Sequence, residues 1–192
     1  LWIAEGRKLN GSPTLFINSN DKEIIDYLKI YNPIITDDNE KGTCLKINLG
    51  DRSTGCKKNI FRDEFRKCID LNNNVLIPYN YKINSTKNRL LLLAGILDGD
   101  GYLQGSYEVC TKWKTLCDDI LFLCRSLGFA AYYGEKIVKD VVYYRICISG
   151  DLEKIPNKLK RRKAEKRLQK KNVLRTSFEI RNIGIGDYYG FE

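Results

Sequence analysis

The sequence contains no histidine and no methionine. Without histidine, Ser-His-Asp hydrolases, Cys-His proteases and histidine-dependent nucleases are excluded. Any catalysis must therefore use carboxylates, lysines or a bound metal. Because the chain begins at Leu1 and has no methionine, we expect it to be a piece of a longer polypeptide.

Long apolar runs are also absent. The longest covers residues 90–97, far short of the roughly 20 residues of a membrane-spanning helix, and no signal-peptide pattern opens the chain. None of the seven cysteines forms a C-x-x-C pair, so a zinc site would need an irregular four-cysteine cluster. Cys117 and Cys124 lie on an apolar stripe, which favours core packing. This cysteine usage predicts a reducing intracellular compartment (nucleus or cytoplasm). The short apolar runs predict no membrane partner.

Positive charge is unevenly distributed along the chain. Residues 158–171 hold nine of the 33 lysines and arginines against one acid, Glu165, so this segment supplies most of the net charge of +9. A concentrated basic segment is typical of a protein that binds a phosphate backbone. A solvated basic helix with no partner has the same composition.

Hydrophobic periodicity predicts two α/β units with the same order of elements, followed by a further segment. The first unit is expected to contain a helix end at 1–6, strands at 14–18, 33–36 and 43–49, and helices at 21–31 and 59–71. The second is expected to contain helices at 86–97 and 116–127, strands at 102–111, 129–133 and 141–149, and a last helix from 152 that continues into the basic run. We expect domains at 1–85 and 86–172, and a strand-like segment that fits neither unit at 173–192.

The central helix ends in an unusual way. Residues 90–97 are apolar all round and should be buried, with Ala94 and Gly95 small enough for a neighbouring helix to approach. Asp98 and Asp100 follow near the negative end of the helix dipole, where each carboxylate costs about 0.3–1 kcal/mol. A divalent cation would compensate, and Mg²⁺ prefers oxygen ligands.

The stretch D-G-D-G allows two other interpretations. Gly101 is a good helix cap, and an aspartate beside it can belong to an ordinary turn. An EF-hand loop starting at Asp98 would place Tyr102 and Val109 at ligand positions, and neither can supply the ligand required, so that interpretation is excluded.

A similar helix ending is found at the start of the chain. Residues 1–6 read LWIAEG, again an apolar helix end with an acid directly before glycine, and Glu5 lies 95 positions before Asp100. If the two helices pack side by side, their carboxylates can hold metal against neighbouring phosphates, as in phosphodiester hydrolysis. The flanking strands would then form a saddle for the DNA major groove.

At these residues the chain resembles a known family. Residues 93–101, LAGILDGDG, are similar to the LAGLIDADG motif of homing endonucleases. The segment SLGFAAYY and the pair Ile77-Pro78 are similar to intein-encoded members, and the closing DYYGFE resembles a strand that begins the C-terminal splicing block. The resemblance implies an α+β, pseudo-twofold duplicated α-β-β-α-β-β-α fold, with the start of a β-rich splicing (Hint) segment at the C-terminus. The chain lacks splicing nucleophiles and a terminal His-Asn pair, so it should not splice alone.

The resemblance also implies a function and site residues. The function is site-specific double-strand cleavage, by a monomer, of DNA with a long target site, using Mg²⁺ held by Glu5 and Asp100. Asp98 is expected to be a helix-end residue. Many members carry a lysine where this chain has Val75, and Lys163, or Lys158, is the candidate for the second such lysine. Expected DNA contacts are Lys112, Lys114, Arg145, Lys158, Lys160, Arg161 and Arg162.

Two alternatives to an active endonuclease remain open. One is a decayed relative that binds DNA or is purely structural, and it is favoured by Val75 and by Glu5 in place of the commoner aspartate. The other is a docking scaffold with no nucleic-acid role, whose affinity for DNA at ~150 mM salt would be negligible.

Overall fold

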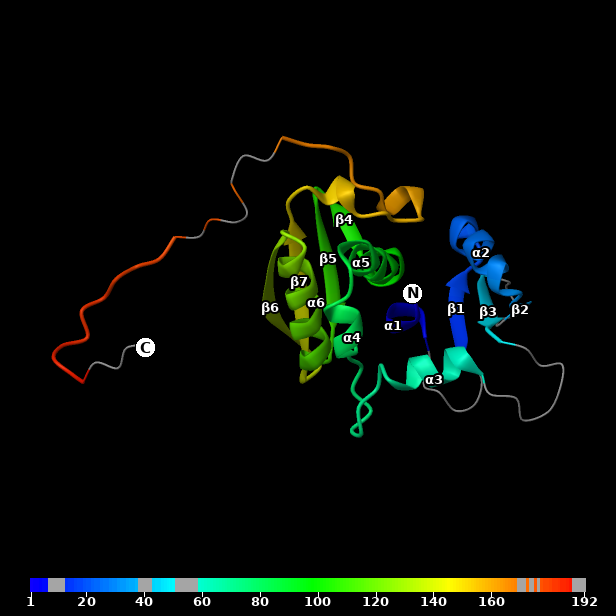
Figure 1. Cartoon of the computed structure of the whole chain (residues 1–192), viewed down its shortest axis with the longest axis horizontal. Coiled ribbons are helices and arrows are strands. Elements are labelled where there is room, and N and C mark those ends of the chain that lie inside the picture. Colours follow the sequence, from blue (N-terminus) through cyan, green and yellow to red (C-terminus); the bar gives the residue numbers. More distant parts are fainter. Residues whose placement is uncertain are drawn as a thin grey trace.

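The structure, a computed structural model, describes residues 1–6, 13–37, 43–50, 59–168, 172, 175 and 177–187. Two helices occupy its centre, α1 (Trp2–Glu5) and α5 (Thr86–Asp100). One β-sheet lies on each side of this helix pair (Figure 1).

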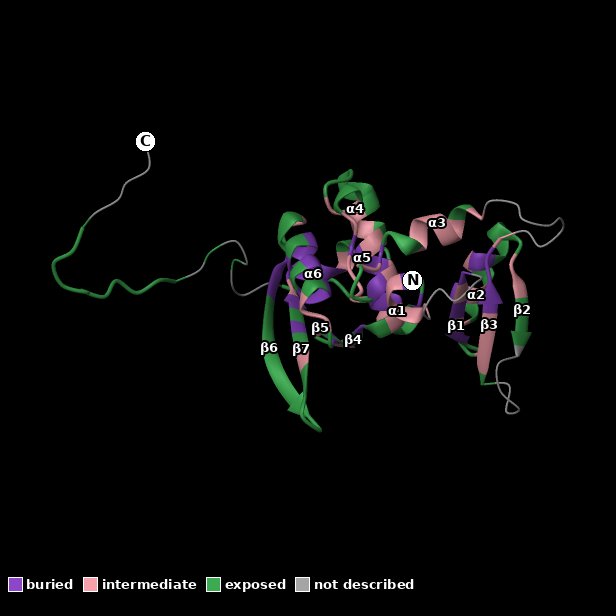
Figure 2. Ribbon diagram, turned by 90° about the horizontal axis from the view of Figure 1, so that it is seen from below, coloured by how far each residue is buried: buried purple, intermediate pink, exposed green. Residues whose placement is uncertain are grey.

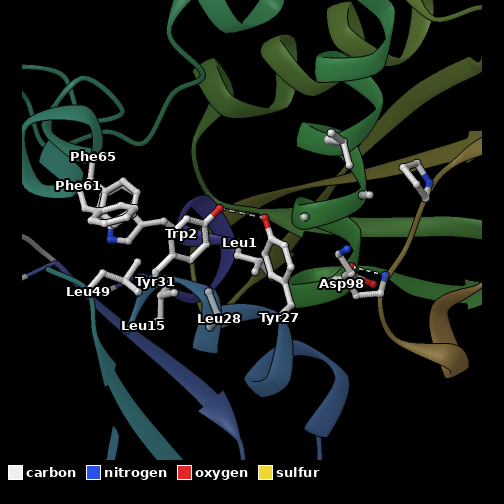
Figure 3. Close-up of a pocket in the computed structure, with 15 residues that line it drawn as sticks. Leu1, Trp2, Leu15, Tyr27, Leu28, Tyr31, Leu49, Phe61, Phe65 and Asp98 are labelled. Carbon is white, nitrogen blue, oxygen red and sulfur yellow. Dashed lines mark hydrogen bonds between the residues drawn. The ribbon is translucent and has the colours of Figure 1, made fainter. Parts of the chain in front are cut away.

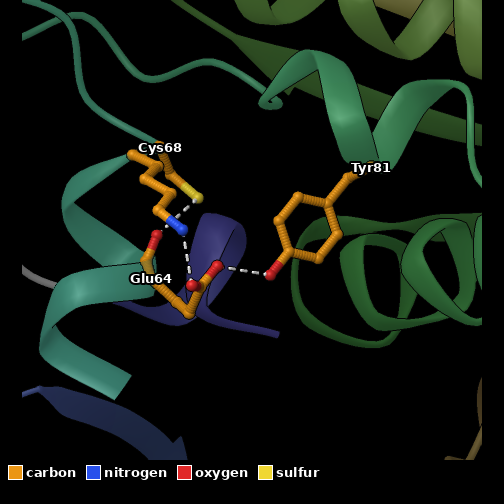
Figure 4. Close-up of polar contacts among 4 residues, drawn as sticks. Glu64, Cys68 and Tyr81 are labelled. Atoms are coloured by element: carbon orange, nitrogen blue, oxygen red, sulfur yellow. Dashed lines mark hydrogen bonds and ion pairs between the residues drawn. The ribbon is translucent and has the colours of Figure 1, made fainter. Parts of the chain in front are cut away.

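The first unit surrounds a three-stranded antiparallel sheet of order β1-β3-β2. Its elements are β1 (Thr14–Asn18), α2 (Lys22–Leu28), a 3-10 turn (Lys29–Tyr31), β2 (Ile34–Asp37), β3 (Cys44–Asn48) and α3 (Ile60–Arg66). The short helix α4 (Tyr79–Lys82) then leads to α5. Figure 4 shows how α3 is tied to α4: the Tyr81 hydroxyl donates to Glu64 Oε2 at 2.8 Å. At the end of α3, Lys67 donates to Glu64 Oε1 at 2.5 Å.

The second unit has a four-stranded antiparallel sheet of order β4-β5-β7-β6. Its elements are β4 (Tyr102–Gln104), β5 (Ser106–Thr111), α6 (Lys114–Ser126), β6 (Ala130–Val138) and β7 (Val141–Ser149). The order β5-β7-β6 repeats the order β1-β3-β2 of the first sheet, and α2 and α6 follow the first strand of each trio. The predicted duplication of an α/β unit is therefore confirmed in the topology.

Each unit has its own core. Leu15 and Ile47 are buried in the first core, whereas Leu97, Ile120 and Ile146 are buried in the second. Figure 2 shows buried residues on α5 and α6 and on β1 and β3, while the far end of the β6–β7 hairpin is exposed.

The cysteine predictions can be checked against these cores. Cys117 and Cys124 are fully buried in the second core, which confirms their packing role. Cys68, Cys110, Cys117, Cys124 and Cys147 form no disulfide. Cys56 lies outside the described residues.

Helices α1 and α5 pack closely because two glycines face α1. A β-carbon on Gly95 would lie 2.7 Å from the backbone nitrogen of Leu1, and one on Gly99 would lie 2.5 Å from the Ala4 Cβ. Real β-carbons do not come this close to other heavy atoms. The expectation that small residues allow a neighbouring helix to approach is thus confirmed at Gly95, and Gly99 extends it.

The predicted basic C-terminal helix is wrong. Residues 150–168 contain only the 3-10 turns Leu152–Lys154 and Lys160–Arg162, joined by extended chain. Pro156 cannot donate a helical hydrogen bond, and the backbone N–H groups of Lys158 and Leu159 donate instead to the Asp98 carboxylate at 2.8 and 3.2 Å. We call residues 152–162 the strap, which runs past α5 toward α2 of the first unit (Figure 1).

Other predicted boundaries also shift. Helix α5 continues through Asp100 instead of ending at 97, and the expected strand 102–111 is a hairpin, because Gly105 (φ 71°) turns the chain between β4 and β5. Residues 177–187 form no strand, with Phe178 and Ile180 exposed, because no strand of the described chain pairs with their backbone. The end of the expected splicing strand, 188–192, lies outside the described residues. Among the helices described, none is both long and apolar enough to cross a bilayer.

Candidate metal and DNA site

Glu5 and Asp100 are the last residues of α1 and α5, and the two helices end in the same way. Gly6 and Gly101 follow in extended conformation (ψ 143° and 141°), and their N–H groups donate to Trp2 O and Leu97 O at 2.8 and 3.0 Å. A β-carbon on either glycine would come too close to that same carbonyl oxygen, at 2.4 and 2.5 Å. The pairs Glu5-Gly6 and Asp100-Gly101 therefore end their two helices with the same geometry.

The two carboxyl groups lie near enough for the charge of Asp100 to act on Glu5. Glu5 Oε1 would lie 3.2 Å from a β-carbon on Gly99, the residue next to Asp100. Burial, with the negative charge of Asp100, raises the pKa of Glu5 from 4.5 to about 7. Burial likewise raises the pKa of Asp100 from 3.8 to about 6, although the nearby Arg162 opposes the shift. The raised pKa values mean that each carboxylate is unfavourable here without a neighbouring positive charge.

This donor set fits a hard divalent cation such as Mg²⁺, because it offers carboxylate oxygens whose charges are otherwise unfavourable. In the described part of the chain, no group of three or more Asp, Glu, Cys or His side chains could hold a metal alone. A cation between Glu5 and Asp100 would therefore need further oxygen ligands from water or phosphate.

A depression of about 650 Å³ opens beside Asp100 and takes its walls from both units. Arg66 and Val75 line it from one side, and Lys112 and Tyr143 from the other. Val75, which stands where the family commonly has lysine, thus lies in the same depression as Asp100. Lys112, one of the predicted DNA contacts, lies there as well.

Arg162 is the strap cation whose charge acts on both carboxyl groups. Its backbone carbonyl accepts a hydrogen bond from the Tyr107 hydroxyl, and its Nε is buried with no hydrogen-bond partner among the described residues. Lys163 is exposed and lines a different depression, with Leu103 and Glu165. The structure therefore brings Arg162, and not Lys163, to the acidic pair.

The Asp98 carboxylate is directed to the strap. It is buried and accepts hydrogen bonds from Asn157 Nδ2 at 3.0 Å and from the backbone of Lys158 and Leu159. Its oxygens are thus occupied in holding the strap on α5. This placement agrees with a helix-end role for Asp98 and not with that of a ligand.

Two strap residues that were predicted to contact DNA instead contact side chains of the first unit. Arg161 pairs with Asp21 of the first unit at 2.8 Å, and the Lys158 ammonium lies 4.4 Å from the centre of the Tyr27 ring. Lys160 is exposed. The strap therefore links the two units through the positive charges that the sequence suggested for DNA.

Beside the strap, an apolar seam of about 240 Å³ lies among α1, α2, α3 and α5 (Figure 3). Trp2 stacks on Phe65 with ring centroids 4.9 Å apart, and the hydroxyls of Tyr27 and Tyr31 lie 3.4 Å apart. Asp98 is the carboxylate at its edge, and its hydrogen bonds go to the strap. We interpret the seam as packing and assign no chemistry to it.

The other predicted DNA contacts belong to the second unit. Lys114 begins α6, pairs with Asp118 and lies 4.7 Å from the Tyr133 ring centroid. Arg145 stands on β7 and pairs with Glu108 of β5. On the face of the sheet opposite α6, the exposed residues include Tyr102, Cys110, Tyr132, Lys136, Arg145 and Cys147.

No protein-family profile matches the chain. Among solved structures, a complex of the homing endonuclease I-DmoI with DNA and Mn is 12% identical, covers 78% of this chain and 85% of that one, and has a TM-score of 0.50. A single-residue variant of I-DmoI with its target DNA and Mg is 11% identical, covers 78% and 84%, and has a TM-score of 0.52. The fold resembles that of I-DmoI.

This likeness confirms the predicted α+β fold. At 11–12% identity, the comparison with I-DmoI concerns the fold, so residue roles must come from the geometry of this chain. That geometry adds Arg66 to the predicted site. Sequence reasoning missed Arg66 because it lies on the first unit, outside the basic run, with no motif around it.

Proposed function

We propose that the chain is a metal-dependent, site-specific DNA endonuclease of the LAGLIDADG type, encoded within an intein. The observation that carries the proposal is the pairing of Glu5 and Asp100 at two like helix ends, with the pKa of each carboxyl group raised. Buried like charges at two negative helix poles are unfavourable unless a cation shares them.

The carboxylates of Glu5 and Asp100 would hold Mg²⁺, which supplies Lewis acidity and lowers the pKa of bound water. Arg162 and Lys112 would face the phosphates of the bound strand, where positive side chains stabilise the developing negative charge. Asp98 keeps the strap, and with it Arg162, in position beside the acidic pair.

Duplex DNA would lie across the exposed faces of the two sheets. Antiparallel strands can enter the major groove, and one sheet on each side of the helix pair allows a long target on a single chain. Lys112, Lys114, Lys160 and Arg145 are the proposed contacts. Lys158 and Arg161 serve first to bind the strap to the first unit.

The intein origin rests on the segments SLGFAAYY, Ile77-Pro78 and DYYGFE in the sequence. In the same proposal, 173–192 begins a splicing segment whose remaining strands are supplied by other parts of the intein. The proposed domains remain 1–85, 86–172 and 173–192, although Ile77 and Tyr81 pack with the second core and Leu159 with the first.

A second candidate function is DNA binding without cleavage. Val75 supports it, because an apolar side chain beside Asp100 cannot polarise the attacking water as lysine does. The two functions share the DNA surface and differ only in chemistry.

The test is incubation of the chain with a plasmid library of randomised sites, in Mg²⁺ and then in Ca²⁺, beside the variant Asp100→Asn. Metal-dependent cuts at a shared sequence, absent from the variant, support the endonuclease. Selective binding without cuts supports the decayed enzyme. Cuts that persist in Asp100→Asn contradict the assignment of the metal site.

A further inference from the structure

Arg145 is held in a defined position on the exposed face of the second sheet. Its Nε and Nη2 donate to the two carboxylate oxygens of Glu108 at 3.0 and 2.5 Å. Glu108 stands on β5 and Arg145 on the neighbouring β7. A bidentate pair of this kind fixes the plane of the guanidinium as well as its position.

The residues on either side of Arg145 are small. Its cross-strand partners are Cys110 on β5 and Gly134 on β6, and a β-carbon added to Gly134 would meet no heavy atom of the described chain within 4 Å. Cys147, two residues along β7, points to the same face and is exposed. The guanidinium therefore projects from a middle strand of the sheet, and its small neighbours leave it accessible to a ligand.

The pair with Glu108 leaves part of the guanidinium free. Glu108 takes the hydrogen on Nε and one on Nη2, so the Nη1 hydrogens and the other Nη2 hydrogen remain available as a second fork. Two parallel donors of this kind match the N7 and O6 acceptors of guanine in the major groove. A phosphate is the poorer partner here, because its charge would be repelled by Glu108.

We infer that Arg145 determines specificity by reading a guanine in the major groove, with Glu108 as its positioning residue. The inference deepens the proposed function and rests on it. Cys110 and Tyr143, which neighbour Arg145 in the sheet, line the depression that contains Asp100. The guanine is therefore expected near the cleaved bonds and not at the end of the target.

The test begins with selection of binding sites from a randomised duplex library in Ca²⁺, using the wild-type chain. Affinities for the selected duplex and for single-position variants of it are then measured for wild type, Arg145→Lys and Glu108→Gln. Lys136→Ala is the matched control, because Lys136 is an exposed cation on the same face.

For the wild type, replacing one guanine should weaken binding by roughly 10- to 100-fold, and 7-deazaguanine at that position should also weaken it. In Arg145→Lys the preference at this position should be largely lost, although charge is kept. Glu108→Gln should reduce the preference while strengthening binding to unrelated DNA. Lys136→Ala should weaken all sequences equally and keep the preference.

Two failures can be told apart. A chain that selects no sequence overturns the proposed function and this inference together. A chain that selects a defined site, but whose base preferences are the same in wild type and Arg145→Lys, overturns only the role of Arg145.

Discussion

Gly99 of α5 faces Ala4 of α1 so closely that a β-carbon on Gly99 would lie 2.5 Å from the Ala4 Cβ. The substitution Gly99→Ala must push the two helices apart. It must also displace Glu5, whose Oε1 would lie 3.2 Å from the new β-carbon of residue 99. Overpacking of this kind costs about 1–3 kcal/mol. We expect Gly99→Ala to lower the Tm in a thermal melt and to lower metal-dependent activity. Gly134→Ala, in open space, is the control; equal Tm values for the two variants would contradict this close packing.

The pKa values of Glu5 and Asp100 predict a pH dependence of stability without metal. They are about 7 and about 6 in the folded chain, against ordinary values of 4.5 and 3.8. Between these limits the folded state binds more protons than the unfolded state. Stability should therefore fall as pH rises from about 4 to about 7 and then level off.

After allowance for solvent screening, this loss amounts to roughly 1–3 kcal/mol. Denaturant unfolding of the wild type and of the double variant Glu5→Gln/Asp100→Asn in EDTA would measure it. The double variant should show a flatter pH profile across the window. Identical profiles would mean that the two carboxyls are not shifted.

Asp98 and Asp100 should respond in opposite ways to the same substitution. Asp98→Asn places an amide against donors from Asn157, Lys158 and Leu159, and we expect a loss of about 2–4 kcal/mol. Asp100→Asn removes a charge from the negative end of a helix, so its Tm at pH 8 without metal should be unchanged or higher. A larger loss in Asp100→Asn than in Asp98→Asn would reverse the assigned roles.

Val75 offers a gain-of-function test. Because Val75 shares the depression with Asp100, Val75→Lys places an ammonium where it can polarise water. Proton-transfer assistance contributes typically 10²–10⁴-fold, so we expect at least a tenfold faster single-turnover cleavage. Val75→Met, similar in length and uncharged, is the control; a matching gain in both variants would exclude a role for the charge.

Much of the site could be predicted from the sequence because it is encoded locally. The apolar run into D-G-D-G predicted a buried helix ending in acids, and the echo LWIAEG predicted its partner. Both acid-glycine endings require glycine, because a β-carbon there would clash with a helix carbonyl oxygen. Such a local requirement is visible in the sequence.

The strap could not be predicted in this way. Its periodicity favours a helix, but Asp98, some 60 residues earlier in the chain, captures the backbone N–H groups of Lys158 and Leu159. The pairing of Arg161 with Asp21 spans 140 positions. Such long-range contacts decide which positive charges remain free for DNA. They cannot be predicted from the composition of the basic segment.

The most direct test of the central claim is the affinity of the chain for its selected duplex in Ca²⁺ and in EDTA. If Glu5 and Asp100 hold a cation against DNA, Ca²⁺ should tighten wild-type binding by about tenfold or more. The double variant Glu5→Gln/Asp100→Asn should bind in EDTA at least as well as the wild type, because two negative charges no longer face the phosphates, and Ca²⁺ should have no effect on it. Equal Ca²⁺ enhancement in both proteins would contradict a metal site at the junction of α1 and α5.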